Sequence, residues 1–244
     1  PKEAMTSESS MNNLLSLKYK IQSLDWVHSV ITLLDIPLLH STDETLTERL
    51  QNFSTLKSEG IDPSKIHTVG NTVSDSLFQH LDISAQKSTI LNDLKLISGE
   101  YFLVTAHRAS NVDFQANLLE LLNLFDEMHK NYTGTIVWPI HPRTQSKLKE
   151  FNIELPSYLQ LITPVGYLDF IQLQKHAKLI LTDSGGIQEE ACLLGVPSLT
   201  LRENTERPEA VEVGASELVG RDAVKAVKAA KRWLSRDDYS WDNP

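Results

Sequence analysis

The stretch LILTDSGGIQEEACLLGVPSLTL, residues 179–201, decides the fold class of this sequence. It opens with the apolar run Leu179–Thr182, which predicts a short buried strand. Residues 183–186 interrupt the run, and Ile187–Leu194 then follows a helical pattern. A second β-rich run, Ser198–Leu201, closes the stretch. A strand, a helix and another strand in such close succession are typical of a parallel sheet.

The same alternation extends back along the chain to about Ile66. The other expected strands are Ile66–Val69, Tyr101–Thr105, Thr135–Trp138 and Leu159–Ile162. The clearest helix is Phe114–Met128, with an apolar stripe made of Leu118, Leu121, Leu122, Phe125 and Met128. Further helices are expected at Leu168–His176 and Ala223–Leu234. We therefore predict an α/β fold, a Rossmann-like parallel sheet with helices on both faces, whose ligands lie outside the carboxyl ends of the strands.

Composition narrows the functions that are open to this chain. It has 244 residues and a net charge of -9, so a surface for duplex nucleic acid is not expected. Cys192 is the only cysteine, which rules out a disulfide within the chain. We see no apolar run of membrane length and no secretion signal, and therefore predict a cytoplasmic protein without a membrane partner.

The chain divides into three parts by composition. Residues 1–65 predict a partial or irregular amino-terminal segment, with a polar tail at Met5–Asn13 and a linker helix at Thr45–Leu56. Residues 66–234 predict the Rossmann-like domain, the part of the chain that is expected to bind the ligand. Residues 235–244 form a short tail.

The break between strand and helix at residues 183–186 is the first candidate site. Ser184 suits the N-cap position, because its oxygen can accept an N–H group of the first helical turn. Gly185 and Gly186 lack a Cβ, so a phosphate can approach the backbone at the positive end of the helix. Glu190, one turn further on, can accept hydrogen bonds from ribose hydroxyls. An ordinary capped helix would show the same pattern.

Two strands each deliver a histidine and an arginine to the ligand edge. His107 and Arg108 follow one strand, and His141 and Arg143 follow the next, with Pro142 stiffening the turn. Histidine can transfer a proton near neutral pH or donate to phosphate, and the arginine fork can hold an anion. A single pair would fit a plain surface, but two pairs at one edge favour a shared site.

A charged loop follows the strand at Ser198–Leu201. It contains Arg202 and the run Thr205-Glu206-Arg207-Pro208-Glu209, which can read sugar hydroxyls and balance charge near a diphosphate. We include Arg207 among the expected substrate-binding residues, although a solvated loop would have similar composition. Since the sequence has no His-x-x-x-His or Cys-x-x-Cys pattern, no metal site is predicted.

Together these segments resemble the carboxyl-terminal half of the non-hydrolysing UDP-N-acetylglucosamine 2-epimerases. The resemblance covers about residues 39–244. The motifs that carry it are VGNTVSD (69–75), TAHR (105–108) with Asn111, HP (141–142), GYLDF (166–170), TDSGGIQEEA (182–191) and TERPE (205–209) with VG (213–214). The glycine-rich block followed by TERPE is far more specific than either motif alone.

The resemblance implies a fold and a reaction. The fold is the carboxyl-terminal domain of a two-domain glycosyltransferase-B-like architecture. The reaction converts UDP-GlcNAc to UDP-ManNAc by elimination and re-addition of UDP, without NAD or metal, and hence without a cofactor. It further implies UDP-N-acetylglucosamine as the binding partner, a homodimer, and a place in polysaccharide biosynthesis.

The resemblance also implies residue roles. The implied roles are a catalytic one for His107 beside the diphosphate, phosphate binding for Ser184, Gly185 and Gly186, ribose binding for Glu190, uracil binding for Phe170, and a second UDP-GlcNAc site near Arg108 and His141.

Two departures from the family pattern bear on activity. Ser110 stands where the family has glutamate in His-Arg-x-Glu-Asn. We do not find the amino-terminal motifs that carry the family's catalytic Asp and Glu in this sequence. The family pattern also continues beyond the position of Pro244, where this sequence stops. We therefore expect the nucleotide-binding half of an epimerase. The alternatives are a nucleotide-sugar binding domain without turnover and a glycosyltransferase of the same fold, and TERPE favours the epimerase over the transferase.

Overall fold

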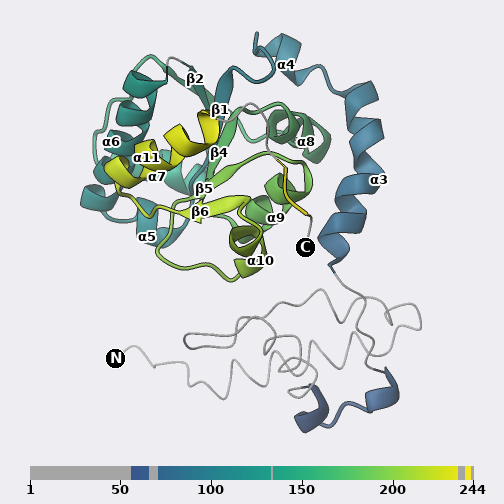
Figure 1. Ribbon diagram of the computed structural model, residues 1–244. Coiled ribbons are helices and arrows are strands. Elements are labelled where there is room, and N and C mark those ends of the chain that lie inside the picture. Colours follow the sequence, from purple (N-terminus) through teal and green to yellow (C-terminus); the bar gives the residue numbers. More distant parts are fainter. Residues whose placement is uncertain (1–55, 66–70, 133, 236–239, 243–244) are drawn as a thin grey trace, which may run out of the picture. The chain divides into compact units, whose positions relative to one another are not determined.

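The computed structural model describes residues 56–65, 71–132, 134–235 and 240–242 (Figure 1). The chain divides into two units, Pro1–Thr72 and Val73–Pro244. In the first unit, the short 3₁₀ helix η3 (Pro63–Lys65) is preceded by Asp62, whose Oδ1 accepts the N–H of Ser64 at 2.9 Å. The expected strand Ile66–Val69, the tail and all but the last residue of the helix Thr45–Leu56 lie outside the described residues.

The second unit is built on a six-stranded sheet in which every neighbouring pair is parallel. Its strands are β1 (Tyr101–Thr105), β2 (Thr135–Pro139), β3 (Leu159–Ile162), β4 (Leu179–Thr182), β5 (Ser198–Thr200) and β6 (Ser216–Leu218). The five strands expected from Tyr101 onward are confirmed. The sequence did not predict β6, because this short edge strand carries one apolar residue among polar ones.

The strand order is β3-β2-β1-β4-β5-β6, the order of a Rossmann fold. After β3 the chain crosses back over the sheet, so that β4 pairs with the other side of β1. Thr105 and Thr182 face each other at the last residues of β1 and β4. Chain connections leave in opposite directions on the two sides of this pair, which opens the crevice where such sheets bind ligands.

Helices cover both faces of the sheet, as predicted (Figure 1). One face carries α5 (Ala109–Val112), α6 (Gln115–Asn131), α7 (Pro142–Glu150) and α11 (Ala223–Leu234). The other side of the unit carries α3 (Thr72–Lys87), α4 (Ile90–Asp93), α8 (Tyr167–Lys175), α9 (Gly185–Leu193) and α10 (Pro208–Glu212). The alternation of β1 explains the two layers, because Phe102 and Val104 join one apolar cluster while Tyr101 and Leu103 join the other.

The helix α6 shows how closely the apolar pattern follows burial. Four residues of the expected stripe are fully buried: Leu118, Leu121, Phe125 and Met128. Leu122 is only partly buried, and Leu124 takes its place in the core. The helices α3 and α7 were not predicted, since each buries only two side chains and has little apolar periodicity.

The last described residues of the chain pack against the helical layers. Trp241 donates its indole N–H to the carbonyl of Cys192, near the end of α9, at 3.0 Å. Its ring meets that of Trp233 edge-on, with centroids 5.8 Å apart. Cys192 is buried in a small cluster with Ala210 and Ala215. None of the helices within the described parts of the chain is long and apolar enough to cross a membrane.

Candidate functional site

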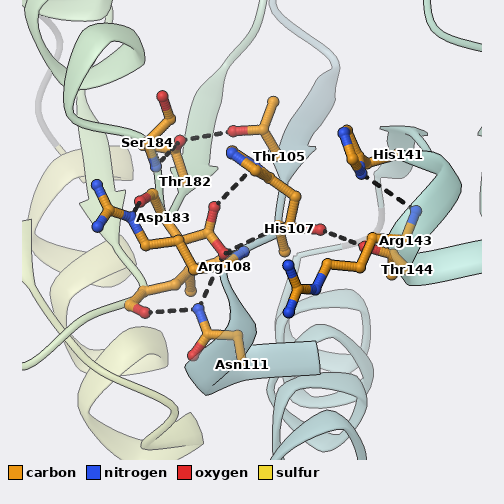
Figure 2. Close-up of polar contacts among 12 residues, drawn as sticks. Thr105, His107, Arg108, Asn111, His141, Arg143, Thr144, Thr182, Asp183 and Ser184 are labelled. Atoms are coloured by element: carbon orange, nitrogen blue, oxygen red, sulfur yellow. Dashed lines mark hydrogen bonds and ion pairs between the residues drawn. The ribbon is translucent and has the colours of Figure 1, made fainter. Parts of the chain in front are cut away.

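A buried carboxylate organises the crevice between β1 and β4. Asp183 follows β4 directly and its side chain is fully buried. Its Oδ2 accepts the backbone N–H groups of His107 at 2.9 Å and Arg108 at 2.8 Å, and the side-chain amide of Asn111 at 3.1 Å (Figure 2). Sequence reasoning treated Asp183 only as the end of a strand. An aspartate directly after a short, mainly apolar strand was the signal that could have identified it.

His107 forms an ion pair with this carboxylate. Its Nδ1 lies 3.1 Å from Asp183 Oδ1, and the His107 side chain is 42% exposed. The hydrogen bond to Asp183 raises the pKa of His107, against the opposing effects of partial burial and of Arg108 and Arg143. Burial by itself raises the pKa of Asp183, but the bonds from His107, Arg108 and Asn111 outweigh it and leave that pKa lowered. Both shifts favour the charged forms, a cationic imidazole beside an ionised carboxylate.

His141 lies beside His107, as two strand-end pairs at one edge predicted. The ring centroids are 5.5 Å apart with the planes tilted by 34°. His141 is the N-cap residue of α7, and its Nδ1 accepts the backbone N–H of Arg143 at 3.2 Å. Arg143 itself turns to Asp113 and forms a two-pronged ion pair with that carboxylate. The second arginine is therefore held at the helix surface, while the two histidines face one crevice.

Ser184 occupies the N-cap position of α9, but its side chain does not cap the helix. We predicted that an N–H group of the first helical turn donates to the Ser184 hydroxyl, and this prediction is wrong. The Ser184 N–H instead donates to Thr182 Oγ1 at 3.0 Å, and the hydroxyl points away from the Asp183 carboxylate (Figure 2). With this arrangement, Ser184 Oγ and the N–H groups of the first turn remain available for a ligand.

The absence of a Cβ has a different consequence at Gly185 than at Gly186. A Cβ at Gly185 would lie 2.8 Å from Glu206 Oε1 and 3.3 Å from Arg207 Cγ, so this glycine makes room for the protein's own loop. A Cβ at Gly186 would meet nothing within 4 Å. The sequence predicted that a ligand could approach the backbone closely at both glycines. Of the two, Gly186 has open space for this approach.

Arg108 is held by two acceptors. Its Nε donates to the carbonyl of Asp183 at 2.8 Å, and its Nη2 donates to Glu206 Oε1 at 2.7 Å. Arg202 contacts the other oxygen of the same Glu206 carboxylate. Burial opposes ionisation of Glu206, but its hydrogen bonds and the two arginines leave its pKa lowered. Two arginines thus share one anionic group in the place where a diphosphate is expected.

The loop that carries Arg207 is anchored to α9. Thr205 donates its hydroxyl to Gln188 Oε1 at 2.7 Å and accepts the Arg207 N–H at 3.0 Å. The Arg207 guanidinium lies 3.4 Å from Glu189. The charged loop is therefore built onto the helix that begins with Gly185, rather than freely solvated.

Glu190 is buried and already hydrogen-bonded. Its Oε1 accepts from the Tyr167 hydroxyl at 3.2 Å and its Oε2 from the Gln174 amide at 2.6 Å, which ties α9 to α8. Burial raises the pKa of Glu190. Each carboxylate oxygen keeps a second lone pair, so a ribose hydroxyl can share this acceptor.

Phe170 lies on α8, one turn past Gly166, and is partly buried against the apolar cluster of that face. Phe170 shares α8 with Tyr167 and Gln174, the two partners of Glu190. A surface depression of about 620 Å³ between α3 and α8 is lined by none of the nine candidate residues. Surface shape alone would not have located the candidate site.

The arrangement offers cationic and N–H donors around a crevice. His107, Arg108 and the start of α9 gather within one set of hydrogen bonds, at the topological switch of the sheet. Such a set suits a group that carries several negative charges, above all one whose charge grows as a bond breaks.

Comparison with known proteins points to a single family. A family model described as UDP-N-acetylglucosamine 2-epimerase matches residues 41–243. The UDP-N-acetylglucosamine 2-epimerase of Methanocaldococcus jannaschii is 47% identical over 196 residues, which is 78% of this chain and 53% of that protein. A relative of the same name from Methanococcus maripaludis is 39% identical over 225 residues, covering 86% of this chain and 61% of its own.

Solved structures agree with the sequence relatives. The Methanocaldococcus jannaschii UDP-GlcNAc 2-epimerase in complex with UDP-GlcNAc and UDP matches with a TM-score of 0.70 and 45% identity, over 78% of this chain and 54% of that one. This likeness confirms the predicted epimerase-like α/β architecture. The chain spans about half the length of the relatives it matches.

Proposed function

The chain belongs to the UDP-N-acetylglucosamine 2-epimerase family, and we propose that it supplies the UDP-sugar-binding half of such an enzyme. The proposed reaction converts UDP-GlcNAc to UDP-ManNAc by eliminating UDP and adding it back after the proton at C2 has returned on the other face. The whole enzyme's activity would need the half that carries the family's catalytic carboxylates.

The observation that carries the proposal is the His107–Asp183 pair at the crevice between β1 and β4. Departure of UDP leaves new negative charge on the β-phosphate, so the step is favoured by cationic and N–H donors that are already in place. The His107 side chain, whose pKa is raised by Asp183, the Ser184 hydroxyl and the first-turn amides beside Gly186 would meet that charge. Glu190 would bind the ribose, Phe170 the uracil, and Arg207 the sugar diphosphate.

One observation favours the second candidate, binding without turnover, for the chain by itself. Among the described residues around His107, the carboxylates of Asp183, Glu206 and Asp113 already pair with cationic side chains. A base that takes the C2 proton must be free to accept it. The proposal therefore assigns proton transfer at C2 to groups outside this crevice.

We also infer a cytoplasmic location, a role in polysaccharide biosynthesis and a homodimer. The location is supported by the single buried Cys192, which needs no oxidising compartment. The biosynthetic role rests on the proposed nucleotide-sugar substrate, and the homodimer on family resemblance alone.

Proton NMR of the purified chain with UDP-GlcNAc in D₂O tests the proposal. We expect broadened uracil signals without exchange at C2, and exchange only once the amino-terminal half of a relative is supplied. Free GlcNAc, which lacks the nucleotide, is the control and should stay sharp. Uracil signals that remain sharp at millimolar protein would overturn the proposal.

A further inference from the structure

We propose that Asp183 is the positioning residue of this site: it fixes the orientation and the proton-bearing nitrogen of His107, and so prepares the imidazole for the leaving diphosphate. The inference rests on the proposed function for the identity of the ligand. It goes beyond that function by assigning a role to a side chain that never meets the ligand, because Asp183 is fully buried.

The contacts of Asp183 with backbone N–H groups fix the position of the His107 backbone. One carboxylate oxygen, Oδ2, accepts the N–H groups of both His107 and Arg108, which are the first residues beyond Ala106 at the end of β1. The Asp183 carbonyl accepts the Arg108 side chain as well. Asp183, which directly follows β4, thereby fixes the path of the chain after β1. It does so although His107 lies 76 positions away in the sequence.

The other oxygen sets the state of the imidazole ring. Among the described residues, Asp183 Oδ1 is buried without a hydrogen-bond partner of its own and lies 3.1 Å from His107 Nδ1, so the ion pair favours a proton on that nitrogen. Nε2 is then the nitrogen left for the ligand, on a side chain that is 42% exposed. This is how a carboxylate orients a histidine in hydrolytic triads, where loss of the charge leaves the ring in the wrong tautomer.

Several charges act on His107 besides Asp183. Arg108 and Arg143 oppose its protonation, and His141 lies beside it with centroids 5.5 Å apart. Asp183 is therefore the group that favours the cationic imidazole among like charges. Without it, the ring would face two arginines and a second histidine.

Replacement of the carboxylate by an amide separates positioning from support of the fold. In Asp183→Asn, the three donors at the Oδ2 position select the amide oxygen, so the backbone contacts are kept. The amide NH₂ then takes the place of Oδ1 and faces His107 Nδ1, which must become an acceptor. The variant should keep the loop in place and drive the ring to its neutral form with the proton on Nε2.

The test is an NMR pH titration of the His107 ring in the full chain, together with UDP affinity from pH 5.5 to 8.5. In Asp183→Asn we expect the His107 midpoint to fall by about one pH unit or more. UDP affinity should fall about tenfold at pH 7, and the gap from the unaltered chain should narrow toward pH 5.5.

Asn111→Ala is the matched control, since it removes a bond to Asp183 Oδ2 and leaves Oδ1 opposite His107. It should lower stability without moving the His107 midpoint. A midpoint that is unchanged in Asp183→Asn, with an affinity gap that is constant across pH, would show that Asp183 only supports the fold.

Two further readouts keep the outcomes distinct. If Asp183→Asn does not fold, the ¹⁵N shifts of His107 in the unaltered chain decide: a proton on Nδ1 above the midpoint supports the inference, and a bare Nδ1 overturns it. If the unaltered chain does not bind UDP, the proposed function fails, whereas the titration of His107 still tests the role of Asp183.

Discussion

Glu206 holds Arg108 beside the first residue of α9, with 2.7 Å between Glu206 Oε1 and Arg108 Nη2. The same oxygen lies 2.8 Å from the position that a Cβ on Gly185 would take, and Arg202 contacts the other oxygen. A carboxylate therefore sits at the positive end of the helix, between two arginines, in the place proposed for a diphosphate.

Loss of this carboxylate should strengthen ligand binding. In Glu206→Gln, UDP no longer competes with an internal anion for Arg108 and Arg202. Since the pair with Arg108 is about two-fifths exposed, we expect a gain of at most roughly 1 kcal/mol, or about fivefold in affinity. Calorimetry at low and high salt should show the gain shrinking with salt.

Glu203→Gln is the control for Glu206→Gln, because it removes one negative charge from the same loop at an exposed position over Gly220. It should leave UDP affinity nearly unchanged. Equal gains in both variants would assign the effect to overall charge, and weaker binding in Glu206→Gln would make Glu206 a support for the arginines.

Gly186→Ala should affect stability and binding in opposite directions. The new Cβ meets nothing within 4 Å, and alanine is the better helix former, so the free energy of unfolding should rise by about 0.4–1 kcal/mol. The same methyl group would project into the space proposed for the phosphates and weaken UDP binding by about tenfold or more. Urea unfolding and calorimetry measure the two effects. Undiminished affinity would remove Gly186 from the site.

Glu190→Ala should reduce binding of the nucleoside in particular. If Glu190 accepts from the ribose, affinity for UDP should fall by about 1–3 kcal/mol, while affinity for inorganic pyrophosphate should not. Stability should fall as well, because the buried Gln174 amide loses its acceptor. Gln174→Leu is the control, since it breaks the same bond and keeps the carboxylate. Parallel losses for UDP and pyrophosphate would contradict the ribose role.

The His107–Asp183 pair should make stability depend on pH. A raised pKa for His107 contributes stability that is full below its unfolded value, about 6.5, and is lost as pH rises through the folded value. A lowered pKa for Asp183 contributes stability that is present above its unfolded value, about 3.9, and is lost as pH falls through the folded value. The pair should therefore contribute most between about pH 4 and 6.5.

Urea unfolding of the unaltered chain and of His107→Gln at pH 5.5 and 8.5 checks this pH dependence. Because His107 is two-fifths exposed, we expect the difference between the two proteins to shrink by less than about 1 kcal/mol on going to pH 8.5. A difference that grows with pH would contradict the pairing.

Ser110→Glu tests the departure from the family pattern. Ser110 is exposed on α5, where a glutamate should change the free energy of unfolding by no more than about 0.5 kcal/mol. If a carboxylate is required there, the variant should turn over UDP-GlcNAc faster than the unaltered chain once the amino-terminal half of a relative is supplied. Equal rates would show that the position is not catalytic.

Apolar patterning predicted the sheet well, because β1, β2 and β4 are short, mostly apolar runs whose residues are largely buried. It failed at β6 and α7, where Leu218 and Leu148 are nearly alone among polar neighbours. These elements form because the existing sheet and α5 offer a surface to pack on, which is tertiary context and leaves little periodicity.

The site was predictable where sheet topology alone fixes proximity. His107 and His141 meet because they follow neighbouring parallel strands. The role of Asp183 and the overlap of Glu206 with Gly185 depend on side-chain directions between distant segments, and no local pattern encodes these. Ser184 illustrates the same limit: its type suits a cap, but Thr182 takes its N–H and the hydroxyl turns elsewhere.

Trp241 gives the molecule a built-in optical probe. Its indole is hydrogen-bonded near the end of α9, the helix whose other end faces the crevice, and its ring lies against Trp233. Any shift of α9 when an anion arrives would change the polarity around the indole and its coupling to the neighbouring ring. Tryptophan emission, with Trp241→Phe as the blank, would then follow events at the crevice in real time and without a label.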